Sequence, residues 1–527
     1  MGPRRTEARQ QKGGLGDQMP KRMLGPLSVF ACGVVVVLLA LAIHAQDNAS
    51  SGGSTGQSQA PLYTPQEEGQ FLRWAVPAPD QAYASIDGNH LHEYVKEFTE
   101  ISTRYRDQGH QLWGRISGTE SDVENREWLG EKFRQAGLSN VHEQPLDLPP
   151  QWLPQSWAVT AQGNGRTLTL QTAQPTYGTP GTPPEGLDLE AVYVGLGSEA
   201  DFAGRDVHGK AVFLYSIPLP SMLHHTAALE GATKRAQDKG AAAIFIVLTL
   251  PGNIRTQMYP QGTTVPTFSM GLDDGNSVRD LIGQAPADSP PHVSIRMDVK
   301  TVSGLKTATV WGELPGTTDE NIMIVAHRDG WFEGATDDAS GVATMLGLAE
   351  YFAKIPKAQR RRTITFLGTT GHHTAGGSAS GIWLAAHKEM FAKTALLINC
   401  EHTAASLTYV AGSGIQTTNG SNALFWYVGG SPRLQDLAIK AFDAFGIVRY
   451  TDPDKSPPGE IGSIYKYAPS VQLIDIGMFN HSDRETEDVV PATGLAAVTR
   501  AYAKIITDAN TIDLKDLLAS SGATSGH

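Results

Sequence analysis

A chain of 527 residues is longer than one ordinary domain and implies two or three domains. Hydrophobic residues make up 40% of it and charged residues 18%, a globular balance that excludes a largely disordered protein. The formal net charge of -12, without a long basic stretch, argues against nucleic acid as a partner. Of the two cysteines, Cys32 lies in an N-terminal apolar segment, so Cys400 has no partner for an internal disulfide in a mature chain.

The N-terminus carries the pattern of an export signal. Several basic residues precede an uncharged, mostly apolar run at residues 23–45. The run is also close to the ~20 apolar residues that span a bilayer. We therefore predict that residues 1–46 are either a cleaved signal peptide or a membrane anchor, with the rest of the chain secreted, periplasmic or anchored outside the cytoplasm. Residues 47–85 are rich in Ser, Gly, Gln and Pro and are predicted to be a flexible linker.

Two amphipathic helices are predicted after the linker. Apolar residues recur at helical spacing over residues 91–101, and a second helix runs from Ser121 until Gly137 ends it. We assign residues 86–185 to the N-terminal part of a larger domain that continues further along the chain.

Residues 186–300 have a different pattern, in which short apolar strands flank a helix. The predicted elements there are a buried strand at 211–215, a helix at 227–239 and a buried strand at 242–247. A β-α-β stretch of this kind implies a small sheet domain. The turn at 206–210 and the run at 265–269 resemble the protease-associated domain, and the resemblance implies that such a domain is inserted at 186–300.

After residue 301 the chain alternates between apolar strands and helices, the pattern of an α/β domain with a buried sheet. The predicted strands are 321–326, 363–367, 395–399 and 471–476, and the predicted helices include 342–352 and 492–507. Ligands bind at the carboxyl ends of strands in such sheets. We assign residues 301–515 to this α/β domain and residues 516–527 to a disordered tail.

Polar clusters follow the predicted strands. They are His327-Arg328-Asp329, Asp337-Asp338-Ala339-Ser340-Gly341, His372-His373, Glu401-His402 and His481-Ser482-Asp483. Each cluster alone is a weak signal, since Asp337 and Ser340 could cap the next helix and a single loop histidine is usually solvated. Because nitrogen and carboxylate ligands from several strand ends converge on one point, the clusters together predict a zinc site.

The segment from Asn321 to His402 resembles the co-catalytic zinc aminopeptidase family, which includes glutamate carboxypeptidase II. The stretch from Gly334 to Gly341 is similar to the family segment whose aspartate bridges two metals, and Phe479 to Thr486 is similar to the last ligand motif. The resemblance implies an α/β zinc-exopeptidase fold of three layers, with a mixed, mainly parallel sheet and an inserted, small, β-rich protease-associated domain.

The resemblance also assigns roles to the residues after the strands. It implies that His327, Asp337, Glu401 and His481 ligate metal, with Asp337 as the bridge between two cations. It implies that Asp329 orients His327 and so belongs to the catalytic set. Glu401 stands where the family most often has Asp, a change that only lengthens the side chain by one methylene.

The chain departs from the family at the pair of glutamates expected after the strand at 363–367. Counted from that strand, the pair falls on His372-His373; counted back from Gly377-Ser378, it falls on Gly371-His372. We use the first count, because strand length is less elastic than the loop that follows. His372 then takes the place of the general base and His373 that of a metal ligand, and histidine suits both roles.

The charge of the ligand set bears on the number of metals. Asp337 and Glu401 are two ligand carboxylates where the family has three, and less negative charge lowers the affinity for a second cation. We therefore expect one or two Zn²⁺ ions per chain.

The preferred hypothesis is a zinc-dependent exopeptidase, and more narrowly an aminopeptidase, in which a metal-activated water hydrolyses the terminal bond of a peptide substrate. One alternative is a catalytically impaired pseudo-peptidase that binds peptides or proteins, because the glutamate base is replaced. Another is a transferase similar to glutaminyl cyclase. The sequence indicates neither the preferred substrate side chain nor the oligomeric state.

Overall fold

The computed structural model describes residues 75–218, 231–374, 379–411 and 414–518. Among these residues, no helix combines the length and apolar character needed to cross a membrane. The signal peptide or anchor predicted at 1–46, and the linker predicted at 47–85 as far as residue 74, lie outside the described residues.

The folded part is longer at both ends than predicted. A 3₁₀ helix, η1 (Ala78–Ser85), lies within the predicted linker, and its Tyr83 is buried against Tyr351 and Phe445. At the other end, α14 (Leu514–Leu518) enters the predicted tail and buries Leu517 completely. Burial of Tyr83 and Leu517 in the core stabilises the two ends of the folded part. The residue composition of these segments does not indicate it.

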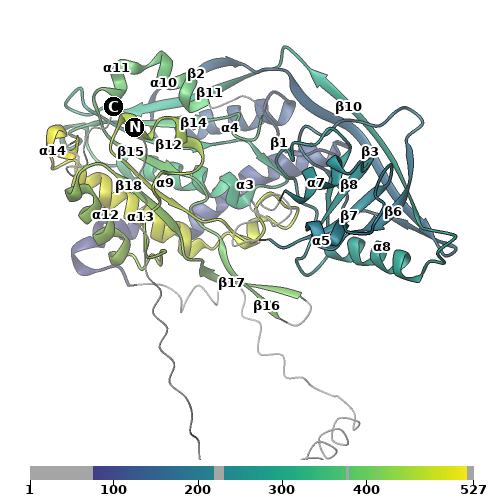
Figure 1. The fold of residues 1–527 in the computed structure, drawn as a ribbon. Coiled ribbons are helices and arrows are strands. Elements are labelled where there is room, and N and C mark those ends of the chain that lie inside the picture. The colour runs from purple at the N-terminus through teal and green to yellow at the C-terminus, as the bar shows by residue number, and fades with distance from the viewer. Residues whose placement is uncertain (1–74, 219–230, 375–378, 412–413, 519–527) are drawn as a thin grey trace, which may run out of the picture. The chain divides into compact units, whose positions relative to one another are not determined.

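A seven-stranded sheet, covered by helices, is the centre of the larger α/β part of the molecule (Figure 1). Its order is β18 (Phe425–Gly429), β19 (Ser470–Ile474), β15 (Thr394–Cys400), β12 (Asn321–His327), β14 (Thr363–Thr369), β11 (Lys306–Leu314) and β2 (Ser139–Asp147). The four strands from β19 to β14 are parallel, and β18, β11 and β2 pair antiparallel at the edges. The predicted mixed α/β fold and the four predicted strands are confirmed.

Both faces of this sheet are covered, which explains why its strands are apolar without alternation. In β12, Ile322 and Ile324 belong to one core cluster, while Met323 and Val325 pack with Trp383 on the opposite face. The first face is covered by α3 (Gly88–Asp107), α4 (Glu120–Gln135), α9 (Gly341–Ala353), α12 (Pro432–Ala444) and α13 (Ala492–Ala509). The second is covered by α10 (Ala379–Ala386), α11 (Lys388–Phe391) and the short turns η4 (Glu460–Ser463) and η5 (Tyr465–Tyr467). The result is the three-layer arrangement that was predicted.

A second sheet of eight strands lies between β2 and β11 in the chain. Its order is β4 (Arg166–Thr169), β3 (Gln151–Gly163), β10 (His292–Val302), β6 (Leu187–Tyr193), β7 (Ala211–Ser216), β8 (Ala243–Leu248), β9 (Thr267–Met270) and β5 (Gln174–Pro175). Helix α8 (Leu272–Gln284) packs on one face, and α5 (Glu199–Phe202) and α7 (Ala232–Asp238) pack on the other. The predicted β-α-β stretch therefore exists, with β7, α7 and β8 as its members.

This second sheet begins earlier than residue 186, where the inserted domain was predicted to start. Strand β3 pairs antiparallel with β10 along its length, from Gln151 opposite Val302 to Gln162 opposite His292. Trp157 and Val159 of β3 are buried in the core of the sheet. Strands β3, β4 and β5 all precede residue 186, so the sheet includes a segment that the sequence analysis assigned to the larger domain.

The remaining short elements connect these parts. They are β1 (Gly114–Arg115), β13 (Gly330–Trp331), β16 (Ser406–Ala411), β17 (Gly414–Ser421), η2 (Ala335–Ser340), η3 (Lys357–Gln359) and η6 (Glu487–Val489). Strands β1 and β13 pair with each other beside the carboxyl end of β12. This pairing ties the chain segment before the second sheet to the loop that carries the first polar cluster.

Candidate metal centre

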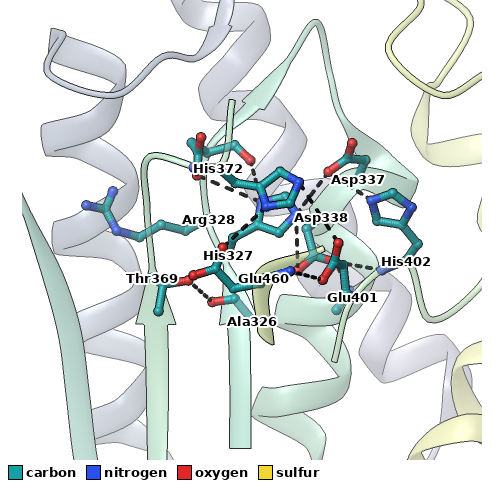
Figure 2. A network of polar contacts seen from close by, with 12 residues as sticks. Ala326, His327, Arg328, Asp337, Asp338, Thr369, His372, Glu401, His402 and Glu460 are labelled. Atoms are coloured by element: carbon teal, nitrogen blue, oxygen red, sulfur yellow. Dashed lines mark hydrogen bonds and ion pairs between the residues drawn. The ribbon is translucent and has the colours of Figure 1, made fainter. Parts of the chain in front are cut away.

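The polar clusters meet at the carboxyl ends of three adjacent strands (Figure 2). His327 is the last residue of β12, and Glu401 and His402 directly follow β15. His372 and His373 lie in the loop after β14. Because β14, β12 and β15 are parallel neighbours, their ends lie at one edge of the sheet and bring these side chains together.

The carboxylate of Asp337 is at the centre of the cluster. Its Oδ1 lies 3.1 Å from Nε2 of His327 and 3.1 Å from Nε2 of His402. Its Oδ2 lies 3.1 Å from Nε2 of His373 and 2.8 Å from Nε2 of His481. One carboxylate thus stands between two pairs of imidazoles, which is the arrangement expected of a bridge between two cations.

Several nitrogen and oxygen atoms of this cluster lack hydrogen bonds to one another and could instead bind a metal ion. In the described part of the chain, the buried atoms Nε2 of His327, Nε2 of His402 and Oδ1 of Asp337 have no hydrogen-bond partner of acceptable geometry. Single ligand atoms of His327, Asp337 and His373 all lie within 4.8 Å of one another, as do those of His327, Glu401 and His402. Imidazole nitrogens and carboxylate oxygens are ligands of zinc, and buried polar atoms without partners are costly unless a cation engages them.

His402 is a candidate ligand that the sequence analysis did not assign. The residue predicted as the ligand after β15 is Glu401, whose Oε2 accepts hydrogen bonds of 2.7 Å from both Asn399 Nδ2 and the backbone N–H of Glu460. His402 has a left-handed backbone with φ of 47°, and its N–H donates to Asp338 Oδ1 at 2.9 Å. That turn of the backbone brings its imidazole to Asp337, so both Glu401 and His402 are available to a cation beside His327.

Asp329 supports two of the histidines. Its Oδ2 accepts from the backbone N–H of His373 at 2.8 Å and lies 3.5 Å from Nδ1 of the same residue. Its backbone carbonyl lies 3.1 Å from Nδ1 of His327, whereas its carboxylate is 3.8 Å away. Burial opposes the charge of this carboxylate, yet the hydrogen bond and charge of the His373 imidazole hold the pKa of Asp329 well below its usual range. The side chain was predicted to orient His327; it contacts His373 more closely, and the backbone contacts His327.

Glu485 holds two ligand residues through their backbones. Its carboxylate oxygens accept hydrogen bonds of 2.6 Å from the N–H of Asp337 and 2.6 Å from the N–H of His481. Burial and the charge of Asp337 raise the pKa of Glu485 to about 8. The sequence offered no signal for this role, because Glu485 lies 148 positions from Asp337 along the chain.

The electrostatics of the cluster reflect its crowding of acids and imidazoles. Burial alone would raise the pKa of Asp337, but the imidazoles of His402 and His373 lower it well below its usual range. Burial lowers the pKa of His481 to about 4, so this ring is neutral, as a metal ligand must be. The site therefore holds an ionised central carboxylate and at least one neutral imidazole.

His372 occupies a different position from the other imidazoles. Its ring stacks on that of His327 with centroids 4.2 Å apart, and its side chain keeps 17% of its surface exposed. Burial opposes its charge, but a hydrogen bond with Glu460 and the charge of Glu401 raise the pKa of His372 to about 10. Cations bound beside it would act in the opposite direction, because like charges destabilise an imidazolium.

Two buried arginines shape the loops that carry the ligands. Arg115 donates from Nε to the carbonyl of Arg328 at 2.9 Å and from its terminal nitrogens to the carbonyls of Glu333 and Gly334. Arg328 is fully buried and donates to Asp122 at 2.5 Å. Arg328, the middle residue of the His-Arg-Asp cluster, thus forms a structural ion pair with Asp122. Arg115 binds the loop between His327 and Asp337 through its backbone carbonyls.

The second sheet also reaches the site. The segment before β9 is pinned to the last ligand loop by a bond of 2.8 Å from the N–H of Gln257 to the carbonyl of His481 and by a bridge between Thr256 and Ser482. This places the ring of Tyr259 with its centroid 5.2 Å from those of His481 and Trp331. Tyr259 is 36% exposed, so its ring forms part of the wall of the site.

The imidazole and carboxylate donors of this cluster are of the kind that zinc requires. Residues 309–444 match the sequence model of Peptidase family M28. The match covers the strands and loops that hold His327, Asp337, His373 and Glu401. The predicted resemblance to co-catalytic zinc peptidases is confirmed.

Known proteins resemble the chain over larger parts. Carboxypeptidase Q of Rattus norvegicus is 24% identical over 59% of this chain and 65% of its own length, and that of Bos taurus is 24% identical over 43% and 49%. The chain thus spans about half to two thirds of the length of these curated relatives. A zinc aminopeptidase from Bacillus subtilis has a TM-score of 0.58 at 15% identity, covering 84% of this chain and 99% of that one. A Peptidase M28 precursor from Shewanella amazonensis has a TM-score of 0.63 at 18% identity, covering 82% and 95%. These structures have the same fold.

Proposed function

We propose that this chain is a zinc-dependent aminopeptidase that removes the N-terminal residue of a peptide or protein. The observation that carries the proposal is the Asp337 carboxylate, with His327 and His402 at one oxygen and His373 and His481 at the other. The two imidazole pairs divide the cluster into two places for a cation. We expect one or two zinc ions per chain, because the central bridge supplies a single carboxylate to both places.

The residues around the cations then divide the work of hydrolysis. Bound zinc supplies a Lewis acid that polarises the scissile carbonyl and acidifies the attacking water. His372, the most exposed imidazole of the group, accepts the proton from that water as its oxygen forms a bond to the carbonyl carbon. When the carbon–nitrogen bond breaks, His372 returns the proton to the leaving amine. Asp329 holds the loop of His372 and His373 in place through both backbone N–H groups.

The charges around the site favour a free α-amino group over a free carboxylate as the recognised terminus. The carboxylate atoms Asp338 Oδ2 and Glu460 Oε1 are buried and have no hydrogen-bond partner in the described part of the chain. Arg115 and Arg328, the two arginines beside the ligand loops, donate to backbone carbonyls and to Asp122. An ammonium group would therefore find acceptors here, whereas a C-terminal carboxylate would meet negative charge.

The domain assignments and the export of the chain remain part of the proposal. Residues 186–300 are assigned to a protease-associated domain, now extended by β3 to β5, because a β-α-β sheet stands there and reaches the site through Tyr259. Residues 1–46 are assigned to an export signal or anchor, because basic residues precede the apolar run. The export signal or anchor places the catalytic part outside the cytoplasm.

The test compares zinc content and peptide hydrolysis in the purified chain and in a double variant, His327→Ala/Asp337→Ala. The matched control is His292→Ala/Asp188→Ala, a surface pair on the second sheet whose side chains are 48% and 68% exposed. We expect the first variant to lose zinc and turnover and the control to keep both. Peptides with a free N-terminus should be cleaved, and N-acetylated ones should not. Zinc binding without turnover of a diverse peptide pool would favour a peptide-binding pseudo-peptidase instead.

A further inference from the structure

We propose that Glu460 is the residue that positions His372 for proton transfer, by accepting the Nδ1–H of the imidazole and leaving Nε2 free as the acceptor. The proposal rests on the hydrolytic function proposed above. It assigns to this chain a carboxylate–histidine pair in place of a single acidic base. The residue comes from the turn η4, which neither the zinc-ligand clusters nor the strand-end pattern includes.

The contact between the two side chains is direct. Oε2 of Glu460 lies 3.3 Å from Nδ1 of His372, and Glu460 is 3% exposed. A carboxylate can only accept a hydrogen bond, so Nδ1 must be the protonated nitrogen of a neutral His372. Its Nε2 then carries the lone pair, and it lies 4.0 Å from Oε1 of Glu401 on the metal side of the ring. The pair thus specifies which nitrogen receives a proton.

The ring has few other restraints on its orientation. One face of His372 stacks on His327 with an interplanar angle of 6°, and a half-turn about the Cβ–Cγ bond would keep that stacking while placing carbon atoms where Nδ1 and Nε2 lie, so the ring has two possible orientations. The hydrogen bond with Glu460 selects one of them (Figure 2). A base in the wrong tautomer cannot accept a proton at the required atom, so the selection has a direct effect on turnover.

The turn that carries Glu460 is built against the metal cluster. The N–H of Glu460 donates to Glu401 Oε2 at 2.7 Å, and its carbonyl accepts from Ser380 Oγ at 2.7 Å. Gly459 has a φ of 78°, and a Cβ at that position would lie 1.7 Å from Oε1 of Glu401. Only glycine allows the backbone to approach the carboxylate so closely. The position of Glu460 is therefore tied to that of Glu401, and its side chain is held where His372 can reach it.

The experiment uses three variants of the full chain, each assayed for zinc content, kcat and KM. Glu460→Met removes the acceptor while filling the space, Glu460→Gln keeps one acceptor oxygen, and Glu460→Ala opens room for an added carboxylate. The matched control is Glu389→Ala, an exposed glutamate of α11. Formate is the probe for chemical rescue, because it restores a carboxylate without the rest of the side chain.

We expect zinc content and KM to change by less than about 3-fold in all variants. We expect kcat to fall by about 100-fold or more in Glu460→Met, within the range of about 10⁴ known for loss of a carboxylate that fixes a catalytic imidazole. Glu460→Gln should fall less, and formate should raise kcat of Glu460→Ala but not of Glu460→Met. The control should match the native chain.

Two results would overturn the inference and leave the proposed function standing. One is an unchanged kcat in Glu460→Met while His327→Ala/Asp337→Ala is inactive. The other is loss of zinc in the Glu460 variants without rescue by formate, which would make the residue a support of the metal site alone. A native chain that holds zinc but hydrolyses nothing would instead refute the proposed function.

Discussion

Replacing Glu485 with Gln tests whether a buried carboxylate holds the two halves of the metal cluster in register. Its two oxygens accept from the backbone N–H groups of Asp337 and His481, each at 2.6 Å. These two ligands come from distant parts of the chain, η2 and the loop after β19. Gln has one acceptor oxygen, so one of the two bonds must be lost and an amide N–H₂ must then face a backbone N–H.

The size of the effect follows from that single lost bond. Leaving a buried backbone N–H without a partner costs about 1–3 kcal/mol. If the misplaced ligand loses that energy on binding, zinc affinity falls by about 5- to 150-fold. This agrees with the roughly 10- to 100-fold losses typical of residues that support metal ligands.

The assay is a competition titration of zinc between the chain and a chelating dye, with circular dichroism to show that the fold is intact. The control is Glu487→Gln, the same substitution two positions along, where the side chain is 40% exposed and lies 3.8 Å from His92. We expect weaker zinc binding in the first variant only. Equal affinity in Glu485→Gln, Glu487→Gln and the native chain would show that Asp337 and His481 are positioned without Glu485, and the reasoning above would fail.

Three further predictions concern stability and substrate contact. Arg328→Met should lower the free energy of unfolding by about 3–5 kcal/mol in urea titrations, because it leaves the buried Asp122 unpaired, whereas Arg361→Met at the partly exposed pair with Asp513 should change it by less than about 1 kcal/mol. Removing zinc with a chelator should lower the free energy of unfolding by about 2.7 kcal/mol relative to the protein with zinc at 100 times its dissociation constant. A melting temperature that is the same with and without zinc would contradict a zinc site in the folded protein. Tyr259→Ala should raise KM for peptides by about 2- to 10-fold with zinc content unchanged, because its exposed ring lies beside His481; an unchanged KM would remove Tyr259 from the substrate path.

The strands of the central sheet were predictable because their sequence pattern has one physical cause. β12 is apolar at consecutive positions, since Ile324 faces one helical layer and Val325 the other. The polar residues that interrupt this pattern mark the points where the strands end. His327, His373 and Glu401 were therefore assigned to one edge of the sheet from sequence alone, and the structure brings them together there.

His402 escaped prediction for a local reason. Alternation along β15 suggests that only one of two adjacent residues after the strand faces the site. The strand ends at Cys400, however, and His402 adopts a φ of 47° that is uncommon for histidine. That backbone turn places the His402 imidazole beside Asp337, with Glu401 and His402 both near His327, and the residue types alone do not indicate it. Glu485 and Glu460 escaped because their roles depend on contacts between loops that are far apart in the chain.

The two sheets are joined at the metal centre itself, and this bears on how the second sheet affects activity. The bond from Gln257 to the carbonyl of His481 and the paired bonds between Arg255 and Asp483 fix the last ligand loop to a segment of the second sheet. His481 has a left-handed φ of 60°, so its orientation depends on what holds its backbone. A displacement of the second sheet would therefore move a zinc ligand as well as Tyr259. The second sheet thus forms part of the framework of the candidate metal centre, and substitutions at this contact should alter zinc affinity and KM together.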